Sequence, residues 1–384
     1  MKQAGGFLTL LHILLTLITT AGCLAGNGSP SHEEQAAIRT TPVPTAAVTG
    51  TLPPVATIPE TPAPPPLVVR GERRSFTFTS GGSEYSFPVD VAPVTGAGNQ
   101  ATCPLMSWRG GEEEQLASWY AGIFRDPAEA PLYDALLGEL RRIRRVDGLN
   151  DDEYLELLTH FVQQIPYDPA APICPRRPDQ VVLDGKGDCD EKSLLLLGLL
   201  DREGYDAAIL IFTDRHHATA GIRIATGGQP SFRVYALDGR RYVYIETTGP
   251  SFIGLYPDSF EDANPVIIPT GNGTITYRAI NDVMHIVSTQ KRMEEKLRWI
   301  NETGTGMEPE IEALESKLRA GTGYSTQEEY DTDYARYTSL VAEYNHYVDQ
   351  FNQIKEVYLY VVQHETDRRG VSGRIENSKV ENLL

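Results

Sequence analysis

The chain has 384 residues, and its 52 acidic residues outnumber its 34 basic ones, which gives a formal net charge of -18. So acidic a chain repels phosphate backbones and anionic lipid headgroups, and the composition therefore argues against a nucleic-acid-binding protein. The length would be long for one domain, but a part at the N-terminus lacks the pattern of a folded region.

The first 22 residues have the features of an export signal. Lys2 precedes an apolar run from Phe7 to Ile18, which is too short for a comfortable membrane span. The residues Thr20-Ala21-Gly22-Cys23 resemble the lipobox of prokaryotic lipoproteins, with threonine where leucine is commonest. We therefore expect cleavage before Cys23, a lipid on Cys23 and anchoring to the outer face of the cytoplasmic membrane. The alternative is an ordinary cleaved signal in which Cys23 is incidental.

Residues 23–68 show no apolar period, and ten prolines lie between Pro30 and Pro66 among Thr, Ala and Val. Such a segment cannot bury enough apolar surface to offset the cost of ordering, so we expect a disordered, extended tether. At roughly 3 Å per residue, it would hold the folded part about 100 Å from a membrane.

A first folded region is predicted over residues 69–130. Apolar and polar residues alternate over 75–79 and 84–91, and Gly81-Gly82 lies between the two runs. This pattern predicts a β-hairpin. Residues 111–124 are predicted to form a helix.

Residues 131–278 are predicted to form the main domain. Apolar residues at helical spacing predict helices over 131–146 and 151–164, and a segment rich in Pro, Asp and Gly over 167–187 predicts a loop. A leucine-rich helix then runs from Cys189 to a stop at Gly204. Three or four strands follow, predicted at 207–212, 217–224, 232–236 and 241–247. Helices followed by an antiparallel meander indicate an α+β fold.

The C-terminal region, residues 279–384, has the pattern of long helices. Aromatic residues recur every seven positions, and a second register is offset by four and interrupted once by Lys355: Tyr330, Tyr337, Tyr344, Phe351 and Tyr358, with Tyr334, Val341, Val348 and Val362. Helices over 281–301 and around Ile311, Leu314 and Leu318 offer partners. We expect a helical hairpin or a small coiled-coil bundle. Packing of the tyrosines against another protein is the alternative.

Residues 185–192 place a cysteine where a loop becomes the leucine-rich helix. Asp188 can cap this helix and Glu191 can reach back to its amide, so Cys189 falls in the first turn. The unpaired amides and the positive end of the helix dipole there favour a thiolate, the nucleophilic form of cysteine. The alternatives are a small buried apolar residue or half of a disulfide.

The number of cysteines bears on that choice. If Cys23 is lipidated, Cys103, Cys174 and Cys189 remain, and an odd count outside the cytoplasm suggests one disulfide and one free thiol. Cys103 and Cys174 lack a helix-start context and form the better pair, which leaves Cys189 free. A bridge between Cys174 and Cys189 remains an alternative, and it would end the catalytic interpretation.

A thiolate nucleophile needs a base and a group that orients the base. His217 opens one predicted strand and Glu246 closes another. If the two strands are antiparallel neighbours, the start of one meets the end of the other and the two side chains become neighbours. The carboxylate would then fix the imidazole tautomer and stabilise its cation. Taken singly, each residue could equally be an ordinary solvated surface group.

These motifs together resemble the transglutaminase-like superfamily of cysteine enzymes, most closely its exported archaeal members. The resemblance covers roughly residues 135–260 and rests on Gly187-Asp188-Cys189-Asp190-Glu191-Lys192-Ser193, His217-Ala218 and Tyr244-Ile245-Glu246-Thr247-Thr248. It implies a papain-like thiol fold in which Cys189 is the nucleophile, His217 the general base and Glu246 the orienting acid. The usual orienting residue is aspartate, which is shorter by one methylene.

The resemblance also implies acyl transfer as the chemistry. Thiolate attack on a peptide amide gives a thioester, which water resolves in a peptidase and an amine resolves in a cross-linking enzyme. The oxyanion would be bound by the Cys189 amide and an upstream polar group, for which Gln180 is a candidate by position. No cofactor is required. Asp188 and Asp190 are similar to calcium-binding positions of periplasmic transglutaminase-like proteinases, although capping alone explains Asp188.

We therefore expect a membrane-tethered, extracytoplasmic thiol enzyme with a protein or peptide substrate at the cell surface. The rival hypothesis is a catalytically inactive transglutaminase-like module that binds or scaffolds, with the tyrosine-rich helices as its interaction surface.

Overall fold

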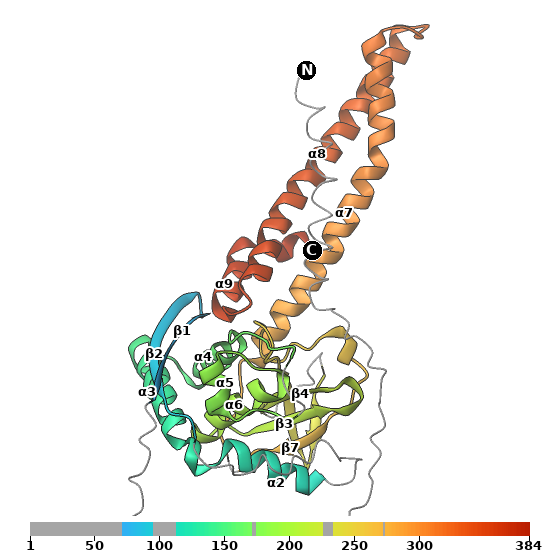
Figure 1. The fold of residues 1–384 in the computed structure, drawn as a ribbon. Helices are drawn as coiled ribbons and strands as arrows, with labels where there is room; N and C mark the ends of the chain where they lie inside the picture. The colour runs from blue at the N-terminus through green and yellow to red at the C-terminus, as the bar shows by residue number, and fades with distance from the viewer. Residues whose placement is uncertain (1–70, 95–112, 171–173, 226–232, 272) are drawn as a thin grey trace, which may run out of the picture. The chain divides into compact units, whose positions relative to one another are not determined.

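A computed structural model describes residues 71–94, 113–170, 174–225, 233–271 and 273–384 (Figure 1). The predicted export signal, the lipid site Cys23, the tether and Cys103 lie outside these ranges. The described residues form a mixture of helices and antiparallel sheets followed by long C-terminal helices, which is compatible with the predicted α+β class. None of the helices in these ranges has the length and apolar character that a membrane crossing would need.

The predicted β-hairpin is present. Strand β1 (Glu72–Ser80) pairs antiparallel with β2 (Ser83–Val91), and the turn residues Gly81 and Gly82 have φ angles of 57° and 74°. Two consecutive positive φ angles define the tight turn that glycine pairs favour. The hairpin packs on α4 (Asp151–Gln163), where the Phe161 ring lies 5.6 Å from that of Phe78 and 5.7 Å from that of Phe87.

The helices α2 (Glu113–Phe124), α3 (Ala130–Asp147) and α4 match the predicted ones closely. The short helix α5 (Pro178–Asp184) was not anticipated and lies inside the segment predicted as a loop. Its Pro178 occupies the first turn and Gly185 ends it with φ 66°. Proline and glycine are favoured at these two positions of a helix, so the same residues that indicated a loop also delimit a helix.

Helix α6 (Cys189–Arg202) is buried along most of its length. Gly198 allows Tyr133 of α3 to lie against the helix, because a Cβ there would collide with the tyrosine ring. One face of α6 packs on β4, and the Ser193 hydroxyl lies 3.0 Å from that of Thr247, just after β6. The helix is thereby fixed between α3 and the sheet.

The main sheet has five antiparallel strands in the order β5-β6-β4-β3-β7. Their bounds are β3 (Ala207–Phe212), β4 (His217–Arg223), β5 (Tyr235–Leu237), β6 (Arg240–Ile245) and β7 (Val266–Pro269). The adjacent, antiparallel pairing of β4 and β6 is the one that the sequence analysis required. Side chains alternate along β6, and one face of the sheet carries an aromatic cluster that includes Phe212, Tyr242 and Tyr244.

The two partner helices predicted near the C-terminus are a single helix, α7 (Ile280–Ala320), which pairs with α8 (Gln327–Gln363). It continues through Pro309, which cannot donate a hydrogen bond to the carbonyl of Thr305. Both residues are exposed, so water can satisfy that carbonyl. The proline therefore does not end the helix.

The first predicted heptad register of α8 is confirmed in the C-terminal part of the helix, where Phe351 and Tyr358 are buried, whereas Tyr330, Tyr337 and Tyr344 are half-buried. The second register is wrong by one position: Leu340, Ile354 and Val361 are buried, whereas Tyr334 is 54% exposed. A heptad seam alternates steps of three and four residues, so an offset of either size is compatible with the first register. The three-residue offset also avoids Lys355.

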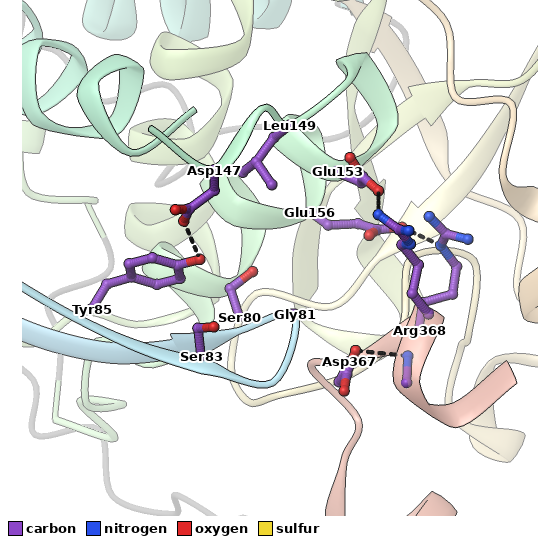
Figure 2. A pocket seen from close by; sticks show the side chains of 12 residues that line it. Ser80, Gly81, Ser83, Tyr85, Asp147, Leu149, Glu153, Glu156, Asp367 and Arg368 are labelled. Atoms are coloured by element: carbon purple, nitrogen blue, oxygen red, sulfur yellow. Dashed lines mark hydrogen bonds and ion pairs between the residues drawn. The ribbon is translucent and has the colours of Figure 1, made fainter. Parts of the chain in front are cut away.

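Helix α9 (Arg368–Ser378) follows α8 and had no clear signal in the sequence. Its buried Arg368 binds Glu156 of α4 at 2.6 Å and Asp282 of α7 at 2.5 Å, and the Tyr277 hydroxyl donates to Glu156 at 2.8 Å. A hollow of about 340 Å³ lies between the β1–β2 turn, the α3–α4 corner and the start of α9 (Figure 2). None of the predicted catalytic residues lines it.

Candidate active site

Cys189 is the first residue of α6, as predicted. The Asp188 carboxylate accepts a hydrogen bond from the Glu191 amide, and the Glu191 carboxylate accepts one from the Asp188 amide, each at 3.0 Å. This reciprocal capping box fixes where the helix begins. The Cys189 side chain lies in the first turn and is 9% exposed.

The thiol of Cys189 is free. Cys174 belongs to a disulfide whose other half lies outside the described residues, as does the predicted partner Cys103. The alternative bridge between Cys174 and Cys189, which would have removed the nucleophile, is therefore wrong.

A buried ion-pair network holds the loop that precedes Cys189. Arg176 donates to both carboxylate oxygens of the fully buried Glu191, at 2.8 and 2.7 Å, and also to Asp168 at 2.9 Å and Asp184 at 2.8 Å. Glu191 thus serves the capping box and the arginine at once. The start of α6 is thereby tied to both ends of the preceding loop.

The thiol environment differs from the expectation based on the helix dipole. The Cys189 thiol donates to Asp190 Oδ1 at 3.3 Å. Burial raises the pKa of the Cys189 thiol, the Asp190 and Asp188 carboxylates raise it further, and the Ala218 backbone amide lowers it by hydrogen bonding. The net shift is upward because burial and two nearby anions outweigh the amides of the helix start. The bond to Ala218 also places the sulfur beside the first residues of β4.

His217 opens β4 and Glu246 directly follows the neighbouring strand β6, but the hydrogen bonds that connect them pass through a third residue. The His217 Nε2 atom lies 2.9 Å from the Tyr244 hydroxyl, and this hydroxyl donates to Glu246 Oε2 at 2.8 Å. Tyr244 therefore stands between the predicted base and its predicted orienting acid.

The Glu246 carboxylate is held in place from the other side. Its Oε1 atom accepts hydrogen bonds from the Thr248 amide at 2.7 Å and from the Thr248 hydroxyl at 2.6 Å. The buried Gln163 side chain of α4 donates to the Glu246 carbonyl at 2.8 Å and to the Ser251 carbonyl at 3.0 Å. The turn after β6 and the end of α4 thus fix the position of this acid.

The imidazole of His217 packs among aromatic rings. Its centroid lies 5.2 Å from that of Phe260 and 6.1 Å from that of Tyr244. Burial lowers the pKa of His217, and the Glu246 carboxylate acts in the opposite direction. The neutral ring, which is the form that accepts a proton, is therefore favoured. The preceding residue, His216, has φ 47°, so the chain turns sharply just before β4.

A buried lysine joins α6 to α4. Lys192, one turn after Cys189, is fully buried and donates to the carbonyls of Gln163 at 3.0 Å and Ile165 at 2.6 Å. Burial lowers the pKa of Lys192 to about 8, against an upward contribution from Glu246. The helix end that positions Glu246 is therefore also bound to the helix that carries the nucleophile.

Tyr244, Gln163 and Lys192 were not among the residues predicted for the site. Strand alternation already put Tyr244 on the face of Glu246, so a signal for it existed. For Gln163 and Lys192 no local pattern exists, because their roles depend on how α4 packs against α6 and β6.

Gln180, the predicted oxyanion residue, lies in α5 and makes a hydrogen bond at the start of this helix. Its side-chain oxygen accepts from the Arg177 amide at 3.1 Å and closes the start of this helix. Its role at the oxyanion stays a prediction.

The predicted calcium ligands supply a poor donor set. One ligand atom each of Asp188, Cys189 and Asp190 lies within 4.8 Å of the others. Calcium prefers six to eight oxygen atoms, whereas one of these three donors is sulfur and Asp188 already caps α6. These residues do not fit a calcium site, and the chemistry below uses no metal.

Comparison of the chain with protein-family models, curated proteins and solved structures gave no match. The function is therefore inferred from the geometry of the site.

Proposed function

We propose that the protein is a membrane-tethered, extracytoplasmic thiol enzyme of the transglutaminase-like type. Its substrate is a peptide amide on a protein or peptide at the cell surface. The observation that carries the proposal is the free thiol at the start of α6, beside the first residues of β4, with His217 on β4 and Glu246 directly after the adjacent strand β6. A nucleophile helix packed on an antiparallel sheet is also what a papain-like core requires, and it supports that finer fold assignment.

In the proposed reaction, neutral His217 takes the proton of the Cys189 thiol, and the sulfur attacks the amide carbonyl carbon. The C–N bond breaks, the imidazolium returns the proton to the leaving amine, and a thioester remains on Cys189. Water or a second amine then attacks the thioester and releases the thiol. Because the thiol donates to Asp190 in this structure, its side chain must rotate away from Asp190 before transfer to His217.

The developing oxyanion needs hydrogen-bond donors. The amide of Cys189 lies at the first position of α6, where backbone amides have no partner within the helix. Gln180 remains the proposed second donor. Tyr167, which is 48% exposed and pairs with Gly187 just before the cysteine, offers an aromatic surface to a substrate beside the nucleophile.

A second candidate function is a catalytically inactive module that binds or scaffolds. It is favoured by the upward shift of the Cys189 pKa and by the bond of the thiol to Asp190. The α7–α8 hairpin would be the interaction surface, since Trp299 and Tyr334 are 45% and 54% exposed.

Cleavage of peptide amides and incorporation of a labelled primary amine, measured with wild type and with Cys189→Ala, distinguish the two functions. The enzyme hypothesis predicts that the substitution lowers turnover by about a thousandfold or more. His217→Ala should act similarly, whereas His216→Ala, a change at the exposed neighbouring histidine, should leave turnover near wild type. Equal turnover of wild type and Cys189→Ala would rule out the nucleophile.

A further inference from the structure

Tyr244 occupies an unusual place between a histidine and a carboxylate. It is fully buried on β6, opposite Gly221 of β4, and its hydroxyl lies 2.9 Å from His217 Nε2 and 2.8 Å from Glu246 Oε2. The Thr219 hydroxyl is a further neighbour, and its own proton is donated to the Ile245 carbonyl. Within the described chain, Tyr244 is the residue through which hydrogen bonds join the imidazole to Glu246.

The chemistry of the three groups fixes the direction of both hydrogen bonds. A tyrosine hydroxyl has one proton, and an ionised carboxylate only accepts. The Tyr244 proton therefore points to Glu246, and its oxygen must accept from the imidazole. Neutral His217 consequently carries its proton on Nε2 and its lone pair on Nδ1.

We infer that Tyr244 is a positioning residue that holds neutral His217 in the Nε2–H tautomer and couples the ring to Glu246. Nδ1 is then the nitrogen that accepts the proton of the nucleophile, and its cation is stabilised through the Tyr244 hydroxyl. The catalytic role of Tyr244 rests on the proposed function. The Nε2–H tautomer of His217 does not.

The arrangement also accounts for glutamate in place of the usual aspartate. Glu246 is fixed by Thr248 on one side, and on the other side its carboxylate accepts from Tyr244 instead of reaching the ring directly. A side chain shorter by one methylene, with Thr248 in place, would move the carboxylate away from the tyrosine hydroxyl. The length of Glu246 is therefore matched to the position of the Tyr244 hydroxyl.

The tautomer can be measured by nitrogen NMR on the full chain with labelled histidine, with the His217 signals assigned by their loss in His217→Gln. We expect wild type to show the Nε2–H form. In Tyr244→Phe, the neutral ring should become a mixture of tautomers, and the pH at which it protonates should fall by about one unit, a tenfold change in proton affinity. Turnover should fall by roughly tenfold to a hundredfold, and the acidic limb of its pH profile should move to lower pH.

Tyr242→Phe is the matched control. Tyr242 is equally buried two residues earlier on the same face of β6, but its hydroxyl donates to Asp206 at 3.1 Å. This variant should change neither the tautomer nor the pH at which the ring protonates. In Glu246→Gln, the Thr248 amide requires the side-chain oxygen, so the NH2 group faces Tyr244 and the tyrosine proton turns to His217 Nε2. This variant should therefore shift the ring to the Nδ1–H tautomer and lower its proton affinity.

An Nδ1–H tautomer in wild type overturns the inference. A folded Tyr244→Phe, verified by its thermal unfolding, with an unchanged tautomer and titration does so as well. The proposed function is tested separately. It fails if Cys189→Ala retains full turnover, and the Nε2–H tautomer can still be observed in that case.

Discussion

The region around α6 and the α7–α8 hairpin differ in how they accommodate charged side chains. Beside Cys189, the charged residues Glu191 and Lys192 are fully buried, and each has named partners in neighbouring elements. In the hairpin, no residue from 305 to 339 is buried, and ion pairs such as Arg336–Glu310 are solvent-exposed. Removing one charge should therefore be costly in the first region and nearly neutral in the second.

The largest effect is expected for Glu191→Ala. The change removes the capping box and leaves Arg176 without its main partner, so the free energy of unfolding should fall by about 3–5 kcal/mol. Glu310→Ala, which breaks an Arg–Glu pair in the hairpin, should cost less than about 1 kcal/mol. Urea unfolding of both variants measures the difference. Equal losses would contradict the contrast between the two regions.

The next effect concerns the seam of the hairpin. Leu340 is buried against α7, whereas Val341, which the sequence pattern had favoured, is only partly buried. Leu340→Ala should lower the free energy of unfolding by about 2 kcal/mol and Val341→Ala by less than half of that. Thermal unfolding followed by circular dichroism tests this order. A larger loss of stability for Val341→Ala than for Leu340→Ala would support the four-residue offset that the sequence pattern predicted.

A smaller, pH-dependent effect is expected at Glu129, the residue directly before α3. Burial and then Asp179 raise the pKa of Glu129 to about 8, although Arg177 acts against them. The folded state thus binds this proton more tightly than the unfolded chain, whose value is near 4.5. The resulting stability is fully present below pH 4.5 and is lost as the pH rises to about 8.

Glu129→Gln should therefore flatten the decline in stability over this interval by on the order of 1–2 kcal/mol. Part of the decline should remain, because burial also raises the pKa of Asp188, to about 7. Urea midpoints at a series of pH values give the measurement. An unchanged slope in the variant would show that Glu129 is not the group responsible.

The smallest effect concerns the reactivity of the thiol. Asp190 raises the pKa of Cys189, so Asp190→Asn should lower this pKa and increase the thiolate fraction near neutral pH by about tenfold. The rate of alkylation of Cys189 as a function of pH reports the change. Glu310→Ala serves as a distant control with an unaltered profile. A slower reaction in Asp190→Asn would mean that the aspartate assists the thiolate.

The sequence predicted those elements whose signals are local. The capping box at Asp188 and Glu191, the glycine turn of the β-hairpin and the strands that position His217 and Glu246 all depend on residues a few positions apart. Helix α9 could not be predicted in this way, because the contacts of Arg368 with Glu156 and Asp282 join three distant helices.

The candidate site shows the same limit. The position of Cys189 was predictable, but the direction of its pKa shift was not, since it depends on burial by the surrounding fold. The pairing of β4 and β6 was predictable, but the insertion of Tyr244 between His217 and Glu246 depends on side-chain reach across the two strands. Electrostatics and side-chain contacts in three dimensions decide these points.

The central claim is that Cys189 forms a covalent acyl-enzyme. Mass spectrometry of the protein quenched during turnover of an activated peptide ester tests it most directly. We predict a mass increase equal to the acyl group on the segment that contains Cys189, present in His216→Ala and strongly reduced in His217→Ala. Turnover without an adduct on Cys189, or an adduct that is equally abundant in His217→Ala, would contradict the proposed mechanism.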